Sequence, residues 1–166
     1  MNERAECDQK RFLFNKWLNL YLHSYSLPLF EKGEIIDANA IQMKIKNKVT
    51  NYEVFNNSIY MLLIELDRAY VPVYIGKSKN PLIRWNSHIK SLINGKGSYQ
   101  RWRSLLLAED ETVKYPAFLV IIPDQKINSP VIPGFPSTVG AVEYQLISLA
   151  SDVYPEYLLN LEGNRR

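Results

Sequence analysis

The spacing of apolar positions changes along the chain from helical to strand-like, and this pattern predicts an α+β protein. Residues 8–27 place most of their apolar side chains on one side of a helix, which Pro28 is expected to end. The run at 58–66 is apolar and rich in aliphatic residues, as is typical of a buried strand. A second short run at 71–76 follows a turn, so the two runs predict a β-hairpin.

The second half of the chain begins with a clearly marked helix. Asn80 is a typical N-cap, Pro81 suits the first helical position, and Gly95 suits the position just after a helix end. Four apolar residues recur at steps of three and four positions within this helix and are expected to face the core. They are Leu82, Trp85, Ile89 and Leu92.

The remaining segments predict further elements. Residues 98–108 and 139–150 have helical patterns, and 115–123 is strand-like. The segment 123–138 holds four of the nine prolines and predicts a long loop of the kind that is often functional or mobile. Residues 29–57 are mixed, with a short helix or strand expected near 35–45.

Composition excludes several classes of protein. The 166 residues are 46% hydrophobic and 22% charged, which is typical of one globular domain with an appendage. No apolar run is long enough to span a membrane, and the charged N-terminus lacks the apolar core of a signal peptide. Cys7 is the only cysteine and His23 and His88 are the only histidines, so neither an internal disulfide nor a Cys/His zinc cage is expected. A cytoplasmic location follows as the expectation.

The basic residues gather in one part of the chain. Residues 74–103 contain seven lysines and arginines and no acid, whereas the other 136 residues carry 13 basic against all 17 acidic residues. The net charge of +3 therefore hides a segment that would attract phosphate groups. A solvated surface that happens to be basic is the alternative interpretation.

Several polar residues beside these predicted elements suit the cleavage of phosphodiester bonds. An arginine can stabilise phosphoryl charge, a carboxylate can hold a metal ion, and phenols can handle protons. Each residue alone has an ordinary interpretation, because a tyrosine in a strand usually fills the core and a lone glutamate is usually solvated. The residues concerned are Tyr60, Tyr74, Gly76, Lys77, Ser78, Arg84 and Glu143.

Taken in order, these residues resemble the GIY-YIG nuclease family. The tripeptide SIY at 58–60 and the tetrapeptide VYIG at 73–76 resemble the two motifs that name the family, with Ser58 in place of the first glycine. The stretch 74–98 is especially similar to intron-encoded homing endonucleases, and the resemblance covers roughly residues 58–163. Four further residues complete the pattern: Arg84, His88, Glu143 and Asn160.

The resemblance implies a fold and a division of the chain. It implies an α+β fold with a three-stranded antiparallel sheet flanked by helices, whose strands would be 58–66, 72–76 and 116–122. Residues 58–166 would form the nuclease domain, with the proline-rich loop at 123–138. Residues 1–57 would be an N-terminal helical extension that serves packing, DNA recognition or dimerisation.

The resemblance also implies roles for the site residues. Glu143 would bind a single Mg²⁺, or Mn²⁺ in its place, and Arg84 would stabilise the charge that grows on the phosphoryl oxygens. Tyr60 would activate the attacking water, either as a phenolate or through a hydrogen-bond relay. Tyr74 would hold this arrangement, and His88 would handle a proton or contact a phosphate.

Other residues would support the site or bind the substrate. Gly76 and Asn160 are expected to support the site structurally. Contacts with the DNA backbone are expected from polar and basic residues around the second strand and the following helices. These are Lys77, Ser78, Lys79, Lys90, Arg101 and Arg103.

The sequence favours one subclass of nuclease and leaves others open. Little room for a separate DNA-binding domain favours a compact, sequence-specific enzyme like the type II restriction endonucleases. Such an enzyme would act on double-stranded DNA as a homodimer or as a transient pair on DNA. A phage or mobile-element enzyme of the nicking or homing type with loose specificity, and a non-catalytic nucleic-acid binding module, are the alternatives.

Overall fold

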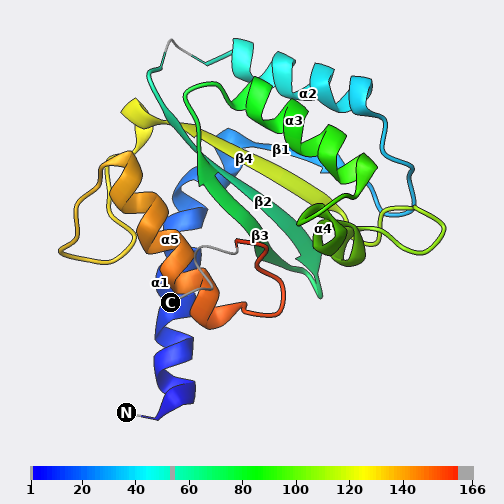
Figure 1. Ribbon diagram of the computed structural model, residues 1–166. Helices are drawn as coiled ribbons and strands as arrows, with labels where there is room; N and C mark the ends of the chain where they lie inside the picture. Colours follow the sequence, from blue (N-terminus) through cyan, green and yellow to red (C-terminus); the bar gives the residue numbers. More distant parts are fainter. Residues whose placement is uncertain (1, 53–54, 161–166) are drawn as a thin grey trace.

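The computed structural model describes residues 2–52 and 55–160, which form an α+β fold with a four-stranded antiparallel sheet (Figure 1). The strand order is β1-β4-β2-β3. The strands are β1 (Ser26–Phe30), β2 (Ser58–Leu66), β3 (Ala69–Lys77) and β4 (Ala117–Pro123). The helices are α1 (Glu3–Tyr25), α2 (Ala38–Thr50), α3 (Pro81–Asn94), α4 (Tyr99–Leu106) and α5 (Val139–Val153), with a 3-10 turn at Asp124–Lys126.

The expected count of three strands is wrong, because β1 adds a fourth strand beside β4. Ser26 pairs with Val120 and Leu27 with Leu119, more than ninety positions further along the chain. Pro28 lies within this strand, where an edge position tolerates a residue that has no backbone N–H. The strand follows α1 directly, so no turn residue separates the two elements in the sequence.

The expected hairpin of β2 and β3 is present, with a tighter turn than its sequence suggests. Asp67 and Arg68 have φ values of 50° and 66°, the left-handed backbone that a two-residue hairpin turn of type I′ requires at both positions. The strand β3 consequently begins at Ala69, earlier than expected. Pro72 lies where the register shifts, opposite Leu63.

Helices cover both faces of the sheet, and each face has its own core (Figure 1). Side chains of β2 alternate between these cores: Tyr60, Leu62 and Ile64 face α2, α3 and α4, whereas Ile59, Met61 and Leu63 face α1 and α5. Because both faces of β2 are buried, its sequence is one continuous apolar run.

The proline-rich loop at 123–138 is held firmly between α1 and α5. The buried Gln145 of α5 accepts hydrogen bonds from the backbone N–H groups of Val131 and Ile132 at 2.8 and 2.9 Å and donates one to the carbonyl of Pro136 at 2.8 Å. The indole of Trp17 in α1 donates to the carbonyl of Ser129 at 3.0 Å. These bonds satisfy backbone groups that have no partner in secondary structure.

The N-terminal residues are part of the packed body. Four residues of α1 are buried, namely Phe14, Trp17, Leu18 and Tyr21. In α2, Ile41 and Ile45 are buried against the opposite face of the sheet. Across the described parts of the chain, no helix combines the length and the apolar character needed to cross a membrane.

Truncating Ile45 tests whether residues before 58 belong to the same folding unit. Ile45→Ala removes a fully buried side chain, so we expect a loss of about 2–5 kcal/mol in the free energy of unfolding. The exposed Met43 of the same helix is the control, and Met43→Ala should change the free energy by about 0.5 kcal/mol or less. Urea unfolding should remain one transition in both variants. A separate early transition in Ile45→Ala would show that α2 folds independently.

Candidate active site

A cleft of about 640 Å³ opens beside the C-terminal half of β3 and is lined by residues from β2, β3, α3, α4 and α5. It gathers four of the five expected catalytic residues, Tyr60, Tyr74, Arg84 and Glu143. Of the expected supporting and DNA-binding residues, it gathers Gly76, Lys77, Arg101 and Asn160. His88 lies beneath the cleft, and Ser78, Lys79, Lys90 and Arg103 lie outside its lining.

The contact between Tyr60 and Gly76 sets the floor of the cleft. The two residues are directly opposed in the β2–β3 pairing. A Cβ atom at Gly76 would overlap the hydroxyl and ring of Tyr60, so only glycine leaves room for the phenol at this position. The requirement for glycine here is therefore steric.

Tyr60 is almost completely buried in an aromatic cluster. Its ring centroid lies 6.0 Å from that of Tyr74, nearly parallel, and 5.3 Å from that of Trp85, edge on. Burial raises the pKa of Tyr60 well above its ordinary value, with a smaller contribution from Tyr74, and the opposing effect of Arg84 does not compensate. The phenol is therefore protonated at neutral pH, which favours a hydrogen-bond relay over a free phenolate.

Arg84 brings positive charge to the tyrosine hydroxyls. Its side chain is exposed at the first turn of α3 and interacts with the hydroxyls of Tyr60 and Tyr74. The hydrogen bond with Tyr60 is the main cause that raises the pKa of Arg84. The guanidinium is thus anchored on the protein side while it faces the open cleft.

His88 is buried and neutral rather than exposed on the helix. Its ring stacks on Trp102, with centroids 5.1 Å apart, and is 3% exposed. Burial, and then the charge of Arg84, lowers the pKa of His88 to about 4. A position beneath the cleft does not support the expected phosphate contact, but it leaves proton handling open.

Glu143 and Lys77 lie beside each other in the lining of the cleft. Glu143 Oε1 lies 4.0 Å from Lys77 Nζ, and the Glu143 side chain is partly exposed. Among the described residues, Glu143 is the one acidic residue in the lining, and no group of three or more His, Cys, Asp or Glu residues could hold a metal ion. An accessible carboxylate suits a hard cation such as Mg²⁺, which retains waters and takes further oxygens from a substrate phosphate.

The C-terminal segment braces the outer edge of β3. The side chain of Asn160 accepts from Ile75 N at 2.9 Å and donates to Ile75 O at 2.7 Å, and Leu159 N donates to Val73 O at 2.7 Å. Arg101 donates to the carbonyl of Leu158 at 3.0 Å and so ties α4 to this segment. These bonds fix the backbone on either side of Tyr74.

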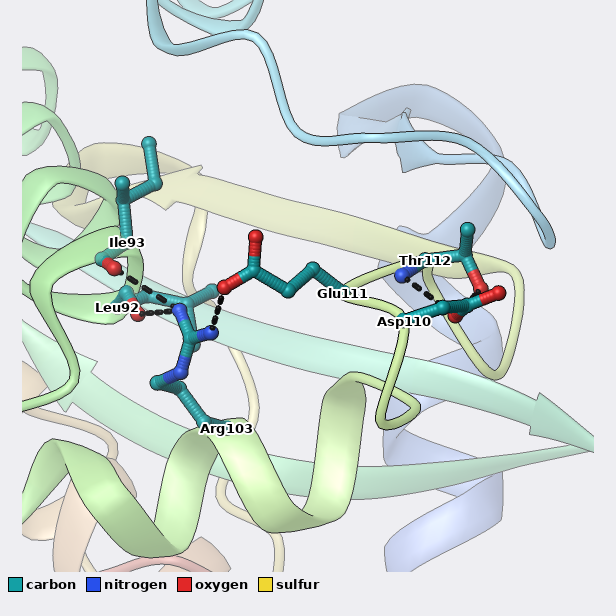
Figure 2. A network of polar contacts seen from close by, with 6 residues as sticks. All are labelled: Leu92, Ile93, Arg103, Asp110, Glu111 and Thr112. Carbon is teal, nitrogen blue, oxygen red and sulfur yellow. Dashed lines mark hydrogen bonds and ion pairs between the residues drawn. The ribbon is translucent and has the colours of Figure 1, made fainter.

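Arg103 makes its hydrogen bonds within the protein, whereas a contact with DNA was expected. It donates to the carbonyls of Leu92 and Ile93 at the end of α3, at 3.2 and 2.9 Å, and pairs with Glu111 at 2.7 Å (Figure 2). These carbonyls have no partner within the helix, so the guanidinium caps the C-terminus of α3. A Cβ at Gly95 would overlap this side chain.

The other expected DNA-binding residues divide into two groups. Lys79 and Lys90 are exposed on the turn before α3 and on α3 itself. Ser78 belongs to the turn structure, because its hydroxyl accepts from Asn80 N at 3.0 Å and its carbonyl accepts from the buried Ser58 hydroxyl at 2.7 Å. Ser58 therefore has a structural role at the position where the family motif has glycine.

Two site residues were missed by sequence reasoning. Tyr99 and Trp102 line the cleft from α4 and surround His88. Their only signal in the sequence is aromatic spacing within a basic segment, which is equally typical of ordinary helix packing.

The protonation of His88 predicts a pH dependence of stability. The unfolded histidine binds a proton below about pH 6.5, whereas the folded one does so only near its lowered pKa of about 4. The contribution of this residue to the free energy of unfolding is therefore present above pH 6.5 and is lost as the pH falls towards 4, by about 3 kcal/mol at most.

Urea unfolding of His88→Gln between pH 7.5 and 4.5 should show a smaller decrease in the free energy of unfolding than the wild type shows. The variant His23→Gln, at an exposed histidine, should retain the wild-type decrease; an identical decrease in His88→Gln would contradict the assignment.

The motif residues and the chain as a whole can be compared with known proteins. The family resemblance rests on the motif residues, and the geometry places most of them around one cleft with a phenol, a guanidinium and a carboxylate. Comparison of the chain with protein-family models, with curated proteins and with solved structures found no match.

Proposed function

We propose that the protein is a metal-dependent endonuclease that hydrolyses phosphodiester bonds in double-stranded DNA. The observation that carries this proposal is the convergence of Tyr60, Arg84 and Glu143 on one cleft from β2, α3 and α5. Tyr60 and Glu143 are far apart in the sequence, so the fold brings them together and their positions in the chain do not. A binding module has no need for an acidic residue in a cleft that must attract phosphate.

The chain's own residues bind and polarise the scissile phosphate. Arg84 and Lys77 carry the positive charge in the cleft nearest to the tyrosines and Glu143, and they would bind the phosphoryl oxygens. The guanidinium already lies against two hydroxyls, so little reorganisation is needed when negative charge grows on these oxygens. Tyr60 would orient the attacking water and accept its proton as it passes its own proton onward.

Glu143 would hold the metal ion. When bound, a divalent cation such as Mg²⁺ supplies charge stabilisation to the phosphate and the leaving oxygen. Partial exposure of the Glu143 carboxylate leaves it accessible from the cleft, while its position on α5 is fixed by the packing of that helix on the sheet. Lys77 lies beside this carboxylate and would contribute to neutralising the phosphate.

Sequence-specific cleavage of the restriction type is the form of this activity that we favour. The ordered loop at 123–138 leads directly into α5, which carries Glu143, and its exposed residues include Phe135. A loop held by Gln145 and Trp17 is a rigid platform, and rigid elements suit the reading of base edges. Cutting of both strands would then require a homodimer or a transient pair of molecules on DNA.

Cleavage assays test the proposed activity directly. Wild-type protein incubated with unmethylated phage DNA and Mg²⁺ or Mn²⁺ should give discrete fragments, and EDTA should abolish them. Glu143→Gln retains the size of the side chain but removes its charge, and we expect a decrease in rate of about 100-fold or more. Glu156→Gln, at an exposed position outside the cleft, is the matched control and should cut like the wild type.

Other results of the same assay would change the assignment. A smear or nicked circles would indicate a nuclease of loose specificity. Intact DNA with both metals, combined with tight binding of the wild type to duplex DNA, would indicate a binding module and would remove the catalytic role from Glu143.

The salt dependence of DNA binding tests the position of the substrate. Lys79 is exposed on the turn between β3 and α3, beside the cleft, so Lys79→Gln should remove one phosphate contact. The slope of log K against log salt concentration should become shallower by about 0.9, as measured by fluorescence anisotropy with duplex DNA in EDTA. Arg4→Gln, in the first turn of α1, is the control. An unchanged slope in Lys79→Gln would place the DNA elsewhere.

A further inference from the structure

The hydroxyl proton of Tyr60 needs an acceptor within the protein. Tyr60 is 1% exposed, and Arg84 donates towards its oxygen. Two groups lie near the hydroxyl as possible acceptors, the hydroxyl of Tyr74 and His88 Nε2 at 3.5 Å. An unprotonated imidazole nitrogen is a stronger acceptor than a phenol oxygen, and Tyr74 is itself a partner of Arg84. His88 Nε2 is therefore the better acceptor, provided that it carries no proton.

The contact on the other side of the imidazole decides which nitrogen carries the proton. His88 Nδ1 lies 2.8 Å from the Tyr99 hydroxyl, the shorter of its two side-chain contacts. If Nδ1 donates to Tyr99, Nε2 is left unprotonated and faces Tyr60. The Tyr99 hydroxyl interacts with Ser91 and is half-buried in the cleft lining, so its own proton can be exchanged with cleft water.

We propose that Tyr99 is a positioning residue that holds His88 in the Nδ1–H tautomer, so that a proton relay runs from Tyr60 through His88 and Tyr99 to solvent. The role in catalysis rests on the proposed nuclease function. Tyr99 is not required to touch the phosphate. It acts through the imidazole, which the stacked Trp102 holds in one plane.

The relay moves one proton without leaving a charge on any buried group. An O–H bond of the attacking water breaks as its proton passes to Tyr60 Oη, and the original Tyr60 proton passes to His88 Nε2. The Nδ1 proton passes to Tyr99, whose own proton leaves to water in the cleft. The hydroxide so formed attacks phosphorus as the bond to the leaving oxygen breaks, and the leaving oxygen takes a proton from water in the cleft. The reverse shift through Tyr99, His88 and Tyr60 then returns one proton to the cleft and restores the Nδ1–H tautomer. Burial disfavours the phenolate of Tyr60 and the imidazolium of His88, and the relay requires neither of these charged forms.

The effect of a substitution at Tyr99 on the His88 tautomer depends on the other groups that surround the imidazole. Tyr60 faces it from β2, Tyr74 from β3, Arg84 lies one turn earlier on α3, and Tyr99 and Trp102 face it from α4. Of these, only Tyr99 contacts Nδ1 through a hydrogen bond. Tyr99→Phe removes that bond and retains the ring beside Trp102, with which Tyr99 has a centroid distance of 5.0 Å.

The tautomer of His88 can be measured on the full chain without any substrate. Long-range ¹H–¹⁵N correlation spectra of the wild type at pH 7 should show His88 as the Nδ1–H tautomer, and His88→Gln identifies the signal. In Tyr99→Phe the Nε2–H form should become populated. The matched control is Tyr52→Phe, which changes a half-buried tyrosine outside the cleft and should leave the His88 tautomer unchanged.

The cleavage rate supplies the second measurement. Tyr99→Phe should cut DNA about tenfold more slowly or worse, with DNA affinity unchanged, because its effect is on proton transfer. Wild-type His88 in the Nε2–H tautomer would overturn the proposal, and so would a Tyr99→Phe variant with the wild-type tautomer and rate. If the wild type cuts no DNA, the nuclease function fails, whereas the tautomer spectra still decide whether Tyr99 positions His88.

Discussion

Tyr60 lies across the backbone of Gly76 in the neighbouring strand, and the arrangement of the cleft depends on this contact. The antiparallel register opposes the two residues, and the missing side chain of glycine leaves the space that the phenol fills. From that position the Tyr60 hydroxyl meets Arg84 at the cleft and His88 beneath it. A shift of one residue in the pairing would turn Tyr60 towards the opposite core.

The site separates uncharged buried groups from charged groups at the surface. Burial disfavours the ionised forms of Tyr60 and His88, so the aromatic cluster beneath the cleft is neutral at physiological pH. The charges lie above it on Arg84, Lys77 and Glu143, where solvent and a bound phosphate can reach them. In the proposed nuclease, such a division would allow protons to be passed below the substrate while phosphate and metal are bound above it.

Segments outside the motifs place the site residues. The strand β1 extends the sheet beyond β4, and α2 covers the same face as α3. On the other face, Gln145 fastens the proline-rich loop to α5 two residues after Glu143. The C-terminal residues Leu159 and Asn160 satisfy the outer edge of β3. The contacts of α2, of the loop and of Leu159 and Asn160 each restrict an element that carries a site residue, namely α3, α5 and β3.

The sequence by itself determined the elements whose signals are local. The cap of α3 is the clearest case, since Asn80 accepts from Ile83 N three residues away and Gly95 adopts the left-handed backbone that ends the helix. The buried β2 and the hairpin could be predicted because strand and helix periodicities act over a few residues. The site residues expected from the sequence also include half of the residues that line the cleft.

Only the tertiary structure decided the fourth strand, the burial of His88 and the contacts of Tyr99 and Arg103. The strand β1 exists because β4, more than ninety residues later, offers its backbone groups, and five residues after a helix carry no comparable signal. Whether His88 is exposed depends on Trp102 and Tyr99 of the next helix. Arg103 donates to a carbonyl at the end of α3 that has no partner within that helix. These outcomes depend on contacts between separate elements, and the free energy of such contacts is absent from any short window of sequence.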